Sequence, residues 1–525
     1  MRLPNPRLVW STVNPFRNPV FVPFALLLVP LASIAAQDDR ARRTGGRNRA
    51  VIALKVGTVH PVSAPTIKNG VILIRGGRIL GVGPEGKVRI PSSAKVEEYP
   101  NAHAYPGLVD ALSNAFTSSR EISNKSINAG TDFFDALDAS DEASRKLIQS
   151  GITTAYVSNR SGATWRGLGA IIRPNSRGFS TLRGKKHGGL SLRMTTGDRA
   201  GHALDRLKQF DTTGNVFDSL EDYEKKQKDY KAYLDHFRKT KKKAPAKPAD
   251  KIGGKPADKT EPKKPGKDAA KETPSTRDRR GGRRGGFGGR RGRPTDTPGS
   301  PTETKPEAGN AAKKDTQDKK GKTAKAGKTA PKKPKWPKRV KKDKAKEALL
   351  SVLNGKLPLR IEVHRKDEIR AALFMALTKE LPGITLEFAT DAADIATELA
   401  EAGAPVVVTD LLPTAADILA KRDRGALPAN LHKAGVAVAI GSGDIRNARN
   451  LTLMAAYACG QGLPEDAAVR ALTLVPAKIL GVDDQIGSLA RNKVADILIT
   501  SGPLLRSDTR VLRVIAQGRT QYEAK

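Results

Sequence analysis

The chain has a single cysteine, Cys459, among its 525 residues. One cysteine excludes a disulfide within the chain, so the folded parts must depend on an apolar core for their stability. The sequence also lacks an apolar run long enough for a typical transmembrane helix. Its apolar run at residues 20–31 is shorter than the about 20 residues that a helix needs to cross a bilayer. No internal repeat is visible, which excludes a repeat architecture.

The first 36 residues have the features of a secretory signal peptide in the usual order. Three arginines come before the apolar run, two prolines interrupt it, and a stretch of small residues ending at Ala36 follows it. We therefore expect residues 1–36 to be a signal peptide, cleaved after Ala35 or Ala36. A retained membrane anchor and a buried N-terminal helix are the alternatives. The expected location is outside the cytoplasm, in a periplasmic or extracellular compartment.

Residues 239–345 have the composition of a disordered segment. Lys, Pro, Ala, Gly and Asp dominate there, and almost no apolar residue recurs at a helical or strand period, so too little surface could be buried to offset the ordering entropy. Residues 241–350 contain 36 basic and 13 acidic residues, which is +23 of the formal +39. The net charge therefore says little about the folded body.

Within this basic insertion, residues 279–293 read RRGGRRGGFGGRRGR. Arg-Gly tracts of this kind bind polyanions, RNA included, through charge and guanidinium stacking. For an exported protein the expected partners are anionic polymers of the envelope, rich in phosphate or carboxylate, and nucleic acid is not expected to be the main partner. A solvated spacer is the alternative.

About 380 residues remain once both stretches are set aside, enough for one barrel with an accessory layer. Short runs rich in β-branched residues, separated by glycine turns, predict strands at both ends of this part. Strands at both ends favour a composite β-sandwich made from residues 50–105 and 487–525. The predicted strands are 51–55, 71–75, 78–82, 95–98, 496–500 and 511–517.

Between these ends, apolar strand-like runs alternate with amphipathic stretches of helical period. This alternation is typical of βα units and a parallel sheet, and so of an α/β fold. The predicted strands are 153–157, 359–363, 384–388, 406–409 and 436–440, and the clearest helices are 367–377 and 391–402.

Three stretches in the right order resemble the amidohydrolase superfamily, in particular its imidazolonepropionase-like and prolidase-like members. They are PGLVD at residues 106–110, SGITT at 150–154, and a C-terminal run with GSL at 487–489. In that run Asn492 stands where the family has glycine, and asparagine tolerates the left-handed conformation that such a turn needs. The resemblance spans nearly all of the folded part and implies a TIM-type (β/α)8 barrel made from residues 106–238 and 346–486.

The resemblance also implies one or two divalent metals, held by His, Asp and a modified Lys, that ionise a water molecule for attack on an amide. Most of these ligand positions carry other residues in this chain. The first His pair of the family falls at Leu112 and Asn114, and the sixth-strand His falls at Phe388. Gly443 stands where the general-base Asp is expected, and the bridging Lys has no obvious counterpart.

The resemblance leaves Glu362 and His364 as metal-ligand candidates and Asp444, one residue late in register, as the catalytic candidate. One His and two carboxylates could hold zinc with an open water position. The structural alternatives are that Glu362 and His364 pair with Arg360 or Arg365, and that Asp444 caps the helix that follows it.

Two functions of different classes follow. The first is hydrolysis of non-peptide C–N bonds in a small-molecule substrate, a cyclic amide or a dipeptide-like compound, at an impaired or altered zinc or other divalent-metal site. The second is a non-catalytic exported barrel that binds a ligand or serves as a structural body, tethered to anionic polymers by its basic insertion. The replacement of three imidazoles favours the second, and with it the loss of the metal.

Overall fold

The structure is a computed structural model that describes residues 50–117, 128–139, 142–160, 163–176, 178–194, 203–243, 337–414 and 424–524. The chain divides into two compact units, Met1–His236 with Pro337–Lys525, and Phe237–Trp336. The predicted signal peptide and most of the predicted basic insertion lie outside the described residues, so both stay predictions.

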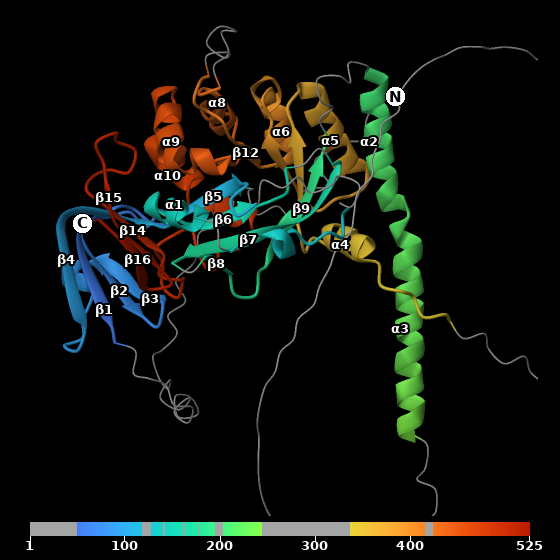
Figure 1. The fold of residues 1–525 in the computed structure, drawn as a ribbon, viewed down its shortest axis with the longest axis horizontal. Coiled ribbons are helices and arrows are strands. Elements are labelled where there is room, and N and C mark those ends of the chain that lie inside the picture. Colours follow the sequence, from blue (N-terminus) through green and yellow to red (C-terminus); the bar gives the residue numbers. More distant parts are fainter. Residues whose placement is uncertain are drawn as a thin grey trace, which may run out of the picture. The chain divides into compact units, whose positions relative to one another are not determined.

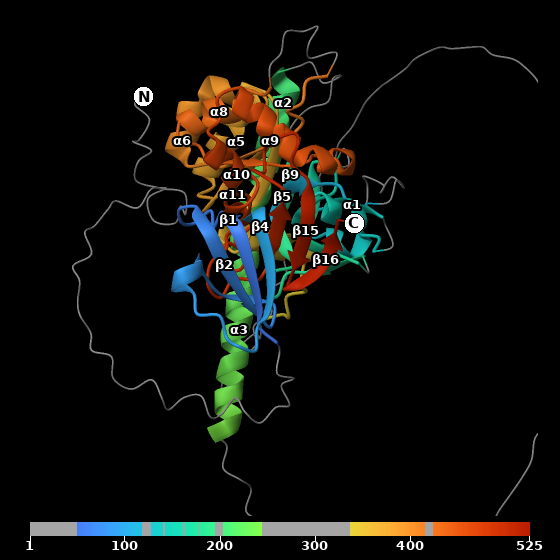
Figure 2. The same cartoon turned by 90° about the vertical axis from the view of Figure 1, so that its left-hand side faces the viewer.

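The two ends of the folded part share one composite seven-stranded sheet, in the order β16-β15-β14-β4-β1-β2-β3. Strand β14 pairs antiparallel with β4, which joins the C-terminal strands to the N-terminal ones as predicted. Figure 2 shows β1, β2 and β4 beside β15 and β16. The strands are β1 (Ile52–Val59), β2 (Ile67–Arg75), β3 (Arg78–Pro84), β4 (Lys95–Pro106), β14 (Ile497–Thr500), β15 (Val511–Ala516) and β16 (Arg519–Glu523).

Turns with positive φ hold this composite sheet together. Gly77 (φ 82°) and Gly518 (φ 70°) lie in two turns that touch, since a Cβ added at Gly518 would come 2.8 Å from the Cα atom of Gly77. Asn492 has a φ of 69°. It therefore adopts the left-handed conformation expected of the residue that replaces the family's glycine.

The second sheet is a nearly closed barrel of eight strands, in the order β13-β12-β11-β10-β9-β7-β6-β5, with β8 paired to β7 outside this path. The ends of β13 and β5 are linked by hydrogen bonds from Gly443 N to Leu112 O and from Ser442 N to Asp110 Oδ1, both 2.8 Å. The strands are β5 (Leu108–Ser113), β6 (Ile152–Val157), β7 (Trp165–Asn175), β8 (Gly178–Thr181), β9 (His187–Arg193), β10 (Leu359–Val363), β11 (Ile384–Phe388), β12 (Val406–Val408) and β13 (Val438–Ile440).

Strand β7 runs antiparallel to both of its neighbours in the barrel, β6 and β9. The other neighbouring pairs of the barrel, β5–β6, β9–β10, β10–β11, β11–β12 and β12–β13, are parallel. The expectation of a wholly parallel sheet is therefore wrong for β7. Residues 158–164, which join β6 to β7, are too few for a parallel crossover, which takes a dozen or more residues. The chain turns back instead, and the barrel is distorted at this strand.

Helices cover the outside of the barrel sheet, with α5, α6, α8 and α9 along one side in Figure 1. The predicted helices 367–377 and 391–402 are α5 and the pair η6–α6. Among the described residues no helix is long and apolar enough to cross a membrane. The helices are η3 (Glu85–Lys87), η5 (Phe133–Ala136), α1 (Ala143–Gln149), α2 (Ala203–Asp218), α3 (Leu220–Lys243), α4 (Lys344–Leu353), α5 (Lys366–Thr378), η6 (Ala392–Ile395), α6 (Ala396–Ala402), α8 (Leu427–Lys433), η7 (Ile445–Asn450), α9 (Leu451–Gly460), α10 (Glu465–Ala471) and α11 (Leu474–Ile479).

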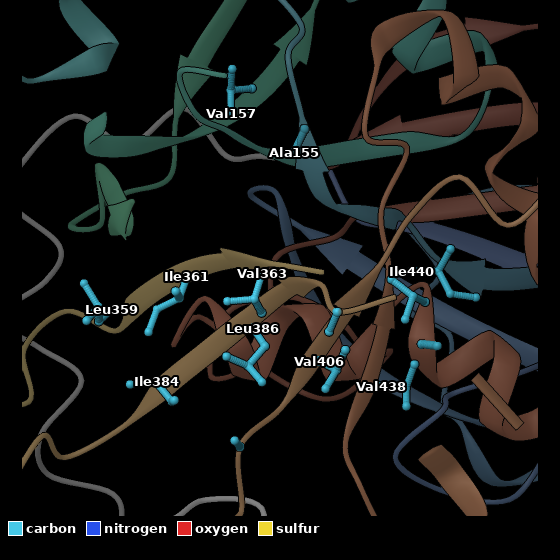
Figure 3. Packing of buried hydrophobic residues seen from close by; sticks show 14 of the residues in the cluster. Ala155, Val157, Leu359, Ile361, Val363, Ile384, Leu386, Val406, Val438 and Ile440 are labelled. Atoms are coloured by element: carbon cyan, nitrogen blue, oxygen red, sulfur yellow. The ribbon is translucent and has the colours of Figure 1, made fainter. Parts of the chain in front are cut away.

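The main core lies on the outer face of the barrel strands, and Figure 3 shows part of it. Alternate residues of β10, namely Leu359, Ile361 and Val363, are fully buried in it. Burying each such side chain contributes roughly 1.5–3 kcal/mol. Because strand side chains alternate between faces, Arg360 and Glu362 point to the barrel interior. The guanidinium of Arg360 accordingly reaches Ala111 O on β5, which is not a neighbour of β10.

Helix α4 begins inside the segment predicted to be an insertion. Asp343 caps it by accepting a hydrogen bond from Ala345 N at 2.9 Å. The Tyr223 hydroxyl of α3 accepts from Asp343 N and donates to Glu347, both at 3.0 Å. Residues 343–345 therefore belong to the cap and first turn of α4.

Candidate functional site

Polar side chains gather where the barrel strands end. In barrels of this type the carboxyl ends of the strands form the face that carries function. Here that face, called the barrel mouth below, receives residues from six strands. They are Asn114 after β5, Arg160 after β6, Arg193 at the end of β9, His364 after β10, Asp410 after β12 and Asp444 after β13.

Glu362, on β10, is held by two arginines. Its side chain is 8% exposed, its Oε2 lies 2.5 Å from Arg166 Nη1, and its Oε1 lies 3.2 Å from Arg193 Nε. Burial acts to raise the pKa of Glu362, but the charges of Arg166, Arg160 and Arg193 outweigh it and hold the pKa below its ordinary value. The carboxylate is therefore ionised and already engaged. The expected pairing with Arg360 or Arg365 is wrong, because Arg166 and Arg193 lie closer.

His364 follows Glu362 on the same side of β10. Its Nδ1 lies 3.0 Å from Thr390 Oγ1, and its ring centroid lies 5.1 Å from that of Phe388. Burial is the main cause that lowers the pKa of His364, against the opposing charge of Glu362. The imidazole is therefore neutral at neutral pH. The structure thus places His364 against Thr390 and Phe388, and the expected arginine partner is wrong here too.

The end of β11 carries backbone strain. Phe388 has a φ of 68° and Ala389 a φ of 41°. A bulky residue in this region is uncommon, and such strain clusters at ligand sites. The guanidinium of Arg160 lies 4.8 Å from the centroid of the Phe388 ring and also donates to Gly443 O. Phe388 is thereby part of the mouth, beneath an arginine.

Asp444 caps the short helix η7, as the structural alternative predicted. Its Oδ1 accepts hydrogen bonds from the backbone N and the side-chain Nε of Arg446, both at 2.9 Å. Its Oδ2 accepts from Asn114 Nδ2 at 2.9 Å. Burial acts to raise the pKa of Asp444, and the hydrogen bonds from Arg446 and Asn114 hold it below its ordinary value. Its oxygens therefore have structural partners.

Asp110, on β5, is fully buried and tied to the last strand. It accepts from Ser442 Oγ at 2.6 Å and from Ser442 N at 2.8 Å. Burial raises the pKa of Asp110 to about 6, although the hydrogen bonds from Ser442 act against this rise. Asp110 thus closes the barrel between its first and last strands.

Deeper in the barrel, Arg360 is fully buried. Its Nε donates to Glu387 at 2.6 Å, its Nη2 donates to Ala111 O at 2.7 Å, and its guanidinium lies 3.8 Å from the centre of the Tyr156 ring. Glu387 is thereby paired below the mouth. The interior is consequently built from arginine–carboxylate pairs rather than from imidazoles.

Part of the chain matches the model of a known protein family. Residues 345–520 match the model of the amidohydrolase family. This segment is an amidohydrolase-family domain. No curated protein matches the sequence.

Solved structures to which the chain is similar include three hydrolases. An amidohydrolase from Thermotoga maritima MSB8 is 20% identical, with a TM-score of 0.62 over 90% of this chain and 100% of that one. A Xaa-Pro dipeptidase with bound methionine in its active site is 12% identical (TM-score 0.44, 90% and 100% covered). Molinate hydrolase is 13% identical (TM-score 0.45, 90% and 94% covered). The likeness to the Thermotoga maritima protein, at 20% identity, shows the fold alone.

The described residues do not offer the ligand set that the resemblance to the superfamily implies. Leu112 is buried in an apolar cluster that includes Phe388, and the Asn114 amide is engaged by Asp444 and by Ile445 N. Within the described ranges no group of three or more His, Cys, Asp or Glu side chains could hold a metal ion. Glu362, His364 and Asp444 are thus not brought together as ligands.

Sequence reasoning missed the three arginines that act on Glu362, namely Arg160 and Arg193 of the mouth and the buried Arg166. Strands β7 and β9 were not predicted, because glycines interrupt their β-branched pattern. Arg166 and Arg193 could therefore not be assigned to the inner or outer face of the barrel. One signal was present, since a carboxylate inside the apolar run of β10 needs a buried cation. That argument predicts a partner for Glu362 but cannot say which arginine supplies it.

Proposed function

We propose that this chain is a non-hydrolytic protein whose barrel mouth binds a small anionic ligand. The observation that carries the proposal is the engagement of Glu362 by Arg166 and Arg193. The family's chemistry needs a metal ion held by carboxylates and imidazoles. In this chain guanidinium groups already surround the Glu362 carboxylate.

Residue chemistry supports the absence of metal-dependent hydrolysis. Leu112 and Phe388 put hydrocarbon at positions where the metal needs lone pairs, and Asn114 replaces an imidazole by a much weaker ligand. A divalent ion at Glu362 would also have to displace Arg166 and would stay close to its charge, which is unfavourable in a site of low dielectric constant. Missing ligands of this kind are not restored by outer partners.

The charge balance of the mouth supports an anionic ligand. Three guanidinium groups act on the single carboxylate of Glu362, and those of Arg160 and Arg193 lie at or near the protein surface. Asp410, after β12, adds a second carboxylate to the mouth, whereas Asp444 does not offset the guanidinium charges because Arg446 pairs with it. One positive charge therefore remains in excess. Arginine forks match carboxylate and phosphate oxygens, and a small carboxylate or phosphate is the ligand class that this arrangement fits.

Elemental analysis of the purified protein after mild dialysis tests the proposal. We expect zinc well below one equivalent, and little hydrolysis of dipeptides or cyclic amides. The variant Glu362→Ala/His364→Ala should leave the metal content unchanged, as should the surface control Glu401→Ala/His432→Ala. Stoichiometric zinc that is lost in the first variant but not in the control, together with amide hydrolysis, would overturn the proposal and support the altered hydrolase.

The proposal includes location and tethering. An exported chain starting near Ala36 or Gln37, with its basic insertion in contact with anionic polymers, would keep the barrel at a charged surface. Mass spectrometry of the exported form tests the processing step, and an intact Met1 on membrane-embedded protein would refute it.

A further inference from the structure

A cavity of about 670 Å³ lies away from the barrel mouth, where the β2–β3 turn, the β15–β16 turn and the end of β8 meet. We propose that it is a second binding site, for a small multivalent anion that carries phosphate or carboxylate groups. Its volume is typical of small-molecule sites. Four arginines line it, Arg78, Arg173, Arg183 and Arg519, and no Asp or Glu is among its described lining residues.

The fold brings two of these arginines together through glycine turns. Arg78 follows the Gly76–Gly77 turn, and Arg519 follows Gly518. A Cβ added at Gly77 would lie 2.7 Å from Gln517 O, so the two turns can approach only because this residue has no side chain. The close approach of the turns places both arginines at one cavity. It also places like charges together, which is unfavourable without a counter-ion.

Arg173 supplies the buried part of the site. Its side chain is 3% exposed and pairs with Asp496, which also accepts a hydrogen bond from Gln517 N at 2.9 Å. The buried Nε of Arg173 has no hydrogen-bond partner among the described residues. Asp496 offsets the charge of Arg173, and the other three arginines form no ion pair with a described carboxylate.

A solvated charged surface is the alternative explanation for exposed arginines. The concave shape speaks against it, because apolar walls, here Ile52, Leu182 and Val494, focus the field of charges that line a cleft. Guanidinium groups that converge from separate turns suit an anion with several oxygens, to which each can donate two parallel hydrogen bonds. This arrangement does not depend on the ligand proposed for the barrel mouth.

Calorimetric titration of the purified full chain with pyrophosphate, and separately with citrate, at constant ionic strength tests the site. We expect the chain to bind at least one of the two probes. Comparing their affinities shows whether the site prefers phosphate or carboxylate groups. Arg183→Gln/Arg519→Gln should weaken this binding by roughly tenfold or more, because two charge-assisted contacts are lost. Arg145→Gln/Arg491→Gln removes the same net charge from exposed positions outside the cavity and should leave the affinity unchanged.

Both double variants keep the basic insertion, so binding to that segment cancels in the comparison. Equal affinities of the two variants, or no binding of either probe to the unaltered chain, would overturn the proposal. If Arg183→Gln/Arg519→Gln does not unfold cooperatively, the single variant Arg519→Gln replaces it, with the same expected direction. Arg160→Gln, in the barrel mouth, should not change the affinity of this site.

Discussion

At the residue scale, the barrel interior depends on buried ion pairs. Glu362 pairs with Arg166, Glu387 with Arg360 and Asp496 with Arg173, and all six side chains are almost fully buried. Removing one member of such a pair leaves an uncompensated charge, whereas replacing both members by apolar residues is often neutral. These pairs therefore favour one specific arrangement of side chains in the interior, but they add little net stability.

The pair of Arg166 and Glu362 gives a direct test. We expect Arg166→Met to lower the free energy of unfolding by about 3 kcal/mol, because Glu362 then loses its closest partner and keeps only the more exposed charges of Arg160 and Arg193. Arg166→Met/Glu362→Met should recover most of this loss. Urea denaturation measures both. The control is Arg446→Met, whose guanidinium is 86% exposed beside Asp444 and whose loss should cost much less than that of Arg166, because solvent screens an exposed pair. Equal losses in Arg166→Met and Arg446→Met would contradict the assignment.

Asp110 predicts a pH dependence. Its pKa is raised from 3.8 to about 6 in the folded state, so its protonated form is the one that the fold favours. The stability that it contributes is fully present below pH 3.8 and is lost as the pH rises to about 6. Relative to Asp110→Asn, the chain should therefore lose up to about 3 kcal/mol between pH 4 and pH 7. Parallel urea titrations of both proteins across this range measure the difference. A difference that does not vary with pH would show that Asp110 titrates normally.

The residues of the mouth show how far sequence reasoning reaches. The cap made by Asp444 follows from local spacing, and the structure confirms it. The replacements at Leu112 and Phe388 follow from motif position, and both side chains lie in one apolar cluster. The partners of Glu362 could not be predicted. Arg166 lies 196 residues away in the chain, on a strand in which glycines interrupt the alternation of apolar and polar residues. Pairing across a barrel depends on strand order and direction, which local pattern does not encode.

At the element scale, the strands with β-branched runs and glycine boundaries were predicted well, and the reversed strand was not. Strands β10 and β11 match their predicted ranges, and β14 pairs with β4 as a composite sheet requires. Strand β7 fails the expectation because its direction follows from a short connection, not from its own residues. The sequence therefore predicts the elements better than their directions.

The contact between the β2–β3 and β15–β16 turns can be tested at Gly77. Gly77→Ala should lower the free energy of unfolding by about 1–2 kcal/mol or more, because alanine is strained at a φ of 82° and its Cβ would overlap Gln517 O. The matched control is Gly86→Ala, where a Cβ meets nothing within 4 Å and the φ is not positive. Thermal or urea unfolding compares the two. Equal stabilities of the two variants would show that the turns need not touch.

At the scale of the whole molecule, two segments far apart in the chain build the barrel. Strands β5 to β9 come before the undescribed segment 244–336, and β10 to β13 come after it. Helices α3 and α4, which flank this segment, are already in contact through Tyr223, Asp343 and Glu347. The two halves of the barrel can therefore meet whatever the length of chain between them, since loop length changes stability only slowly.

Deletion of residues 244–336, with a short Gly-Ser linker between Lys243 and Pro337, should leave a barrel that unfolds cooperatively. This deletion keeps Asp343 and the first turn of α4, unlike one drawn at residues 239–345. The change in the free energy of unfolding should stay within about 1 kcal/mol. Loss of a cooperative transition would show that the segment contributes to the core.

The same deletion should remove most of the salt-sensitive binding to polyanions. Residues 244–336 contain 27 basic and 11 acidic residues, and so +16 of the formal +39. Counter-ion release makes such binding fall steeply with salt, with a slope set by the number of phosphates neutralised. A salt series with long-chain polyphosphate should thus give a much shallower slope for the shortened chain. A full-length control, with the arginines of residues 279–293 changed to Gln, separates the Arg-Gly tract from the remaining lysines. An unchanged slope in the shortened chain would assign the binding to the rest of the chain instead.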